Sequence, residues 1–204
     1  MIRLVAITLS CLLLSSQPAL ARPIAPLEGL EALRRALQGL QDFSAEITQE
    51  KQLSIMKKKL VMQGQVRFRK PDLFLMDLLP PYAGRIVLRD TRLEQRIGRD
   101  GELMRIVLPA EQGLTRWLAT LARPVTAVPA GMTVRADLQG QLYTVTIAPG
   151  GTGQLKEVTV QFQEDGQLRK LMLEERNSDR SVLTFRSMRR NSGLRESDFS
   201  MERP

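Results

Sequence analysis

Few side chains in this sequence have the types and spacing that enzyme chemistry requires. Glu46 with Glu50, and Asp72 with Asp77, are carboxylate pairs that could act as the acid and the base of a glycoside hydrolase, although nothing in the sequence places either pair in a cleft. The chain has no His, which excludes a Ser-His-Asp triad. We therefore predict a protein that is not an enzyme and needs no metal and no cofactor, and we keep a carboxylate-dependent hydrolase as a remote alternative.

The first 21 residues have the pattern of a cleavable secretory signal peptide. Arg3 supplies the positive charge, residues 4–14 form an apolar run, and Ala19-Leu20-Ala21 is a small-residue cleavage site. The run is too short to cross a bilayer, which takes roughly 20 residues. Cys11, the single Cys, fits a lipoprotein signal poorly. We predict an exported protein whose mature chain, residues 22–204, forms a single domain.

The chain is basic, with a formal net charge of +8, and the signal peptide removes only one Arg. Such a surface suits an anionic partner, for example lipid headgroups or an acidic protein face. We predict no nucleic-acid partner, because the chain is exported and only 4% of its residues are aromatic. A partner-docking role is predicted for five basic residues, whose alternative role is a solvated surface: Lys57, Lys58, Lys59, Arg85 and Arg89.

The apolar residues predict two helices and a mainly β domain. Leu27, Leu30, Leu33 and Leu37 recur at helical spacing, and residues 109–122 carry a second apolar helical face. Elsewhere apolar and polar residues alternate, as in a half-buried antiparallel sheet. About 10–11 strands are predicted, over residues 43–48, 60–69, 73–79, 84–90, 92–98, 102–108, 132–138, 141–148, 155–163, 167–175 and 180–188.

The simplest arrangement of these elements is one strongly curved sheet whose concave face is covered by the two helices. The space between sheet and helices would then be an apolar, ligand-binding cavity. Its predicted lining residues come from the strands and from the second helix: Met62, Val66, Phe68, Phe74, Leu88, Trp117, Leu118 and Leu121.

Several short motifs, in one order, resemble the LolA/LolB family of lipoprotein carriers. Residues 43–49 (Phe-Ser-Ala-Glu-Ile-Thr-Gln) are similar to the first strand of the family. Residues 64–74 are similar to its Gly-x-apolar-x-apolar-x-basic-Pro-x-x-Phe signature, and residues 191–201 to its closing segment. Three positions depart from the family pattern. Leu75 stands where the best-known carriers have an Arg that bonds the lid, Thr91 where the Gly of an Asp-Gly turn is usual, and Tyr143 where a Trp is often found.

The resemblance implies a half-open antiparallel barrel with a helical lid over the cavity. It also implies a monomeric periplasmic carrier that takes acyl chains of lipoproteins, or other amphiphilic lipids, from an inner-membrane exporter to an outer-membrane acceptor. The alternative is a lipid-sensing or adaptor protein of the same fold that acts with a membrane export or signalling partner.

Overall fold

A computed structural model of the chain describes residues 20–56, 58–98, 101–110, 113–151 and 153–202, without the side chains of residues 117, 120 and 121. Most of the predicted signal peptide, with Cys11, lies outside the described residues. Among the described helices, neither is long and apolar enough to span a membrane.

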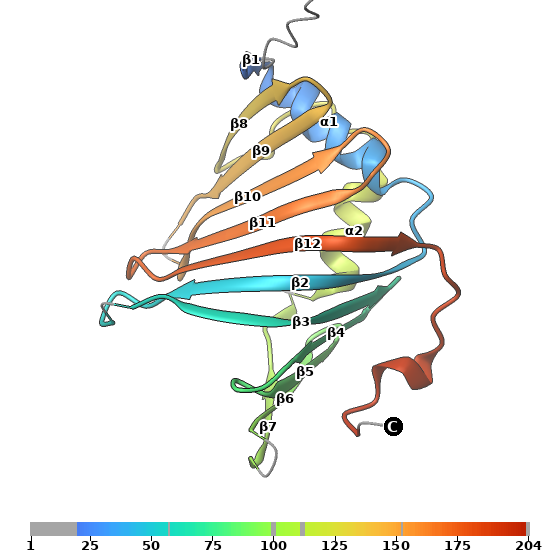
Figure 1. Cartoon of the computed structure of the whole chain (residues 1–204). Coiled ribbons are helices and arrows are strands. Elements are labelled where there is room, and N and C mark those ends of the chain that lie inside the picture. Colours follow the sequence, from blue (N-terminus) through green and yellow to red (C-terminus); the bar gives the residue numbers. More distant parts are fainter. Residues whose placement is uncertain (1–19, 57, 99–100, 111–112, 152, 203–204) are drawn as a thin grey trace, which may run out of the picture.

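The strands form one antiparallel sheet whose order is β1-β8-β9-β10-β11-β12-β2-β3-β4-β5-β6-β7 (Figure 1). The sheet is not closed into a barrel, because β1 and β7 are its two edges. Within the described residues it has twelve strands: β1 (Arg22–Ile24), β2 (Asp42–Gln52), β3 (Leu60–Arg69), β4 (Leu73–Leu78), β5 (Gly84–Arg89), β6 (Arg92–Ile97), β7 (Leu103–Val107), β8 (Met132–Gln139), β9 (Leu142–Pro149), β10 (Leu155–Gln163), β11 (Leu168–Glu175) and β12 (Arg180–Arg190).

The predicted mainly β fold is therefore confirmed, with one strand more than the sequence indicated. The added strand is β1, three residues that pair with Leu138, Asp137 and Ala136 of β8. The sheet joins the two halves of the chain where β12 pairs with β2, so that Phe185 lies opposite Ile47.

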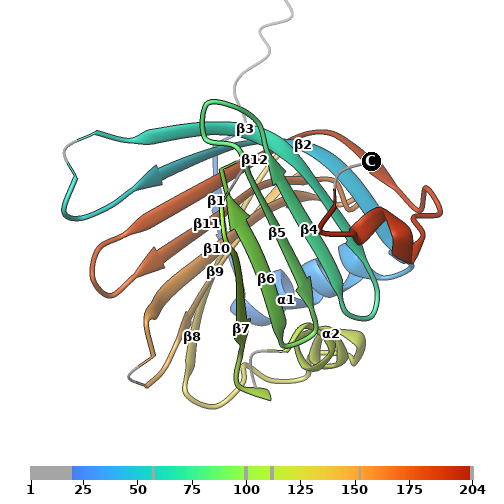
Figure 2. The ribbon, with the colours of Figure 1, turned by 90° about the horizontal axis from the view of Figure 1, so that it is seen from below.

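Two helices lie on the concave side of the sheet: α1 (Pro26–Leu37) and α2 (Leu114–Ala122) (Figure 2). Helix α1 begins with Pro26 and has an acidic residue in its first turn and two Arg residues in its last, as the helix dipole favours. It packs on β8, β9 and β10. At Gly29 the approach is so close that an added Cβ would lie 2.3 Å from Cβ of Ala136.

The C-terminal segment covers part of the convex face. It includes a 3₁₀ turn, η2 (Glu196–Phe199), whose Phe199 is fully buried against Leu73, Leu75 and Val87. Arg67 donates a hydrogen bond to the carbonyl oxygen of Asp198. Leu75, the position where the family pattern has an Arg, thus packs under the C-terminal segment and faces away from the helices.

Candidate functional site

An apolar cavity of about 370 Å³ lies between α1 and the strands β9 to β12. Every residue that lines it is apolar, and together they form two walls. The helix contributes Leu33 and Leu37, and the sheet contributes Ile147, Pro149, Leu155, Val158, Val160, Leu168, Leu171, Leu173 and Phe185. Since no polar group lines the walls, the cavity suits a hydrocarbon ligand better than water.

Five of the eight predicted lining residues lie together beside this cavity. Met62, Val66, Phe68 and Phe74 of the sheet and Leu118 of α2 belong to one core cluster. The same cluster contains Phe185, Leu37, Leu168 and Leu171, which line the cavity. Phe43 connects the two groups, with its ring centroid 5.5 Å from that of Phe68 and 6.5 Å from that of Phe185.

The other three predicted residues are not among those that line this cavity or belong to the adjoining core cluster in the described part of the chain. Leu88 is half-buried on β5, opposite Phe74 on one side and Leu93 on the other. The side chains of Trp117 and Leu121 lie outside the described part of the chain. A ligand-binding role for all eight residues stays a prediction.

Sequence reasoning missed the walls of the cavity that come from β9 to β12. The signal was present on β10, because Val158, Val160 and Phe162 alternate with the polar residues between them. On the next strand Leu171, Met172 and Leu173 form a continuous apolar run instead. Tyr143, where the family often has a Trp, stacks on Phe162 with 5.3 Å between ring centroids. The local sequence could not show that α1 lies on the other side of a cavity from these strands.

A second cavity, of about 400 Å³, lies where residues 124–130 pass over α1. Ile147 lines both cavities, so the two adjoin. We call residues 123–130, which follow α2, the strap.

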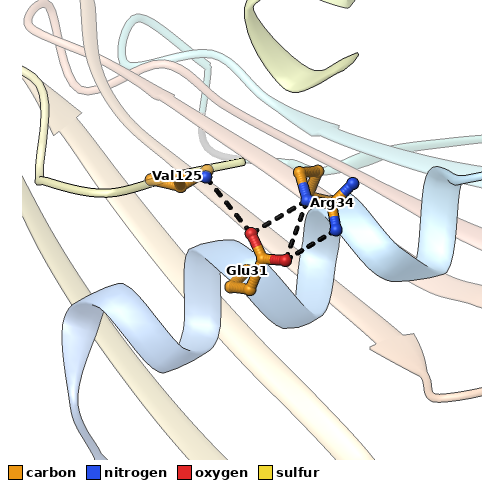
Figure 3. A network of polar contacts seen from close by, with 3 residues as sticks. All are labelled: Glu31, Arg34 and Val125. Carbon is orange, nitrogen blue, oxygen red and sulfur yellow. Dashed lines mark hydrogen bonds and ion pairs between the residues drawn. The ribbon is translucent and has the colours of Figure 1, made fainter. Parts of the chain in front are cut away.

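The strap is joined to α1 by one carboxylate (Figure 3). Glu31 accepts a 3.2 Å hydrogen bond from the backbone N–H of Val125 and a two-pronged ion pair from Arg34, with a shortest distance of 2.6 Å. The bond to Arg34 makes the largest contribution and the bond to Val125 the second, and they lower the pKa of Glu31 from 4.5 to about 2. The contact is therefore ionic at neutral pH and holds the strap against the helix.

The described basic residues that were predicted to dock a partner differ in burial and in their contacts. Lys57 lies outside the described residues; Lys58 and Lys59 are exposed, and Lys59 pairs with Glu50 at 3.3 Å. Arg85 is buried and lies 3.5 Å from Asp77. Arg89 pairs with Glu196 and donates a hydrogen bond to the carbonyl oxygen of Phe199, so it holds the C-terminal segment. Their docking role stays a prediction.

Three of the four carboxylates considered for hydrolysis take part in other contacts. Glu50 pairs with Lys59, Asp77 pairs with Arg85, and Glu46 is exposed and accepts a 3.4 Å hydrogen bond from Ser187. No group of three or more metal-ligating side chains occurs among the described residues.

Comparison with known proteins identifies the family. Residues 38–202 match the family model described as outer membrane lipoprotein carrier protein LolA. The chain belongs to the LolA family. LolA family members are periplasmic, and they are carriers rather than enzymes. A comparison with curated protein sequences finds no significant match.

Solved structures that are similar to this LolA family chain have low sequence identity to it. A DUF1329 family protein from Desulfovibrio piger has a TM-score of 0.52 and 11% identity, with 87% of this chain and 98% of that chain covered. A LolA superfamily protein from Nitrosomonas europaea has a TM-score of 0.44 and 9% identity, with the same coverage of 87% and 98%. The MucA/MucB complex of Pseudomonas aeruginosa has a TM-score of 0.49 and 10% identity, with 87% and 61% covered.

Proposed function

We propose that this chain is a periplasmic carrier that binds the acyl chains of lipoproteins or other amphiphilic lipids and takes them from the inner to the outer membrane. The observation that carries the proposal is the wholly apolar cavity between α1 and the strands β9 to β12. Family membership supports the same function. An exporter that delivers the cargo and an outer-membrane acceptor that receives it are the partners this function requires.

The energetics of a hydrocarbon chain explain why such a carrier needs this cavity. Each CH₂ group that leaves water for an apolar site gains about 0.8 kcal/mol. A lipid anchor therefore crosses an aqueous compartment only if a protein shields it. The residues around the cavity satisfy this need without a polar group that would lose its hydration, and the cluster with Phe68 and Phe74 extends the apolar surface along the concave face.

The proposal predicts that Val160→Phe weakens the binding of an acylated ligand. Val160 lines the cavity on β10, and a Phe ring there occupies space that the acyl chain needs. If two CH₂ groups of the ligand are no longer buried, the binding free energy weakens by about 1.6 kcal/mol, and the dissociation constant rises roughly tenfold. The measurement is fluorescence titration of the chain from residue 22 with a labelled, triacylated lipopeptide.

Val61→Phe is the matched control, because Val61 is 53% exposed. This variant should bind the lipopeptide as the unchanged protein does. Thermal unfolding of both variants checks that they are folded. An unchanged dissociation constant for folded Val160→Phe would remove the cavity from the proposal, and absence of any lipopeptide binding by the unchanged protein would contradict the carrier function.

A further inference from the structure

A narrow opening of about 150 Å³ lies between the C-terminal end of α1 and helix α2. It is lined by Arg34, Leu37, Gln38, Gly39, Lys70, Leu118 and Ala122. Leu37 lines both this opening and the apolar cavity. An amphiphile whose acyl chain filled the cavity would therefore have its polar end close to this opening.

Two half-buried cations lie at the C-terminal end of α1. Lys70, in the turn after β3, has its Nζ 3.3 Å from the carbonyl oxygen of Leu37. Arg190, at the end of β12, donates a 2.9 Å hydrogen bond to the carbonyl oxygen of Ala36. The C-terminal end of a helix dipole amounts to about half an elementary negative charge, whereas Lys70 and Arg190 each carry a full positive charge. A net positive charge stays beside the opening.

No carboxylate in the described part of the chain forms an ion pair with Lys70. Its pKa is lowered from 10.5, first because burial removes its hydration and second because the charge of Arg190 repels it. Arg34, the other cation of the opening, is already paired with Glu31. Of these two cations, Lys70 is therefore the one that has no ion pair with a carboxylate among the described residues and could bind an incoming anion.

Lys70 also lines a larger, polar cleft of about 460 Å³. Four cations line this cleft, Arg69, Lys70, Arg89 and Arg92, against the three acids Asp72, Asp90 and Glu196. The apolar cavity, the narrow opening and the charged cleft therefore follow one another through two shared residues, Leu37 and Lys70. An amphiphile with an anionic headgroup changes in the same order, from its apolar acyl chain to its charged headgroup.

We propose that Lys70 binds the phosphate or carboxylate headgroup of an amphiphile whose acyl chain lies in the apolar cavity. This inference rests on the proposed carrier function and adds to it the chemical class of the cargo. The carrier then prefers anionic lipids or lipopeptides to neutral ones of the same chain length, because a half-buried cation interacts more strongly than an exposed one.

The test compares two ligands with the same acyl chain, lysophosphatidic acid and monoacylglycerol, both below their micelle concentrations. The unchanged protein should bind the phosphate-bearing ligand at least about tenfold more tightly. Lys70→Gln should lose this preference, while its affinity for monoacylglycerol stays the same. Lys70→Arg keeps the charge and should keep the preference, as should Lys170→Gln, which changes an exposed Lys on β11.

The outcomes separate this inference from the carrier function. Equal binding of the two ligands by the unchanged protein, or an unchanged preference in folded Lys70→Gln, overturns the headgroup site and leaves the carrier function standing. Failure of both ligands to bind overturns the carrier function itself. If inorganic phosphate alone binds at Lys70 and the two lipids bind equally, the site takes a free anion, which also overturns the inference.

Discussion

Glu31, through its ionised carboxylate, connects helix α1 with the strap, the two parts of the chain that border the second cavity. Its carboxylate holds Arg34 of the same helix and the backbone N–H of Val125 in the strap. The pKa of Glu31 falls to about 2, because both contacts favour the ionised form. The ionised contact thus contributes stability above a pH of about 4.5, where the unfolded chain also ionises this group, and loses it as the pH falls to about 2.

We predict that Glu31→Gln lowers the thermal unfolding temperature at pH 6, since a neutral amide loses the ion pair with Arg34. The difference from the unchanged protein should shrink as the pH falls from about 4.5 to about 2, because the unfolded state of the unchanged protein then binds a proton at Glu31 and is stabilised relative to the folded state. Thermal melts followed by circular dichroism at pH 6 and at pH 2.5 measure this. An equal difference at both pH values would contradict the assigned pKa.

Burial of single residues could be predicted from the sequence more easily than their partners. The alternation of apolar residues correctly indicated that Val66 and Phe68 face the core. The buried position of Arg85 could not be read in this way, since it depends on the register that places Arg85 opposite Asp77. The contact of Glu31 with Val125 joins residues 94 positions apart and left no local signal.

Among the elements, α1 is placed by a close contact with β8. An added Cβ at Gly29 would lie 2.3 Å from Cβ of Ala136, a distance that two carbon atoms do not adopt. We predict that Gly29→Ala destabilises the protein by about 1–3 kcal/mol, the usual cost of overpacking, although Ala is the better helix former. Denaturant unfolding measures the free energy of unfolding.

The companion variant is Gly29→Ala combined with Ala136→Gly, which removes the methyl group that the new Cβ would meet. This double variant should regain most of the lost stability. If Gly29→Ala alone is as stable as the unchanged protein, α1 is not held at this distance by Gly29.

The helices and strands were largely predictable from the sequence, but which of them pack against each other was not. Periodicity indicated eleven strands and both helices, because each has a regular apolar face. It missed β1, whose three residues include Pro23 and are too short for a pattern. The predicted lining residues came from β3, β4, β5 and α2, whereas the apolar cavity lies between α1 and the strands β9 to β12, a position set by long-range packing.

At the scale of the whole molecule, the C-terminal segment strengthens the convex face. We predict that Phe199→Ala destabilises the protein by about 3–5 kcal/mol, because the ring is fully buried against Leu73, Leu75 and Val87. Met201→Ala, at the partly buried margin of the same cluster, should cost less. Chemical unfolding ranks the two variants.

The same Phe199 variant separates stability from binding. Below its unfolding temperature it should bind a triacylated lipopeptide normally, since its defect lies on the face opposite the cavity. Weakened binding by the folded variant would mean that the convex segment also shapes the cavity.

The open edges of the sheet set how wide a ligand the molecule can hold. In a closed barrel, strand number and shear together determine the diameter. Here β1 and β7 do not pair with each other, so neither quantity is fixed around a ring. A change in coiling can move the two edges apart without breaking a ladder hydrogen bond. Under the proposed carrier function, the internal width would then adjust to the number of acyl chains bound.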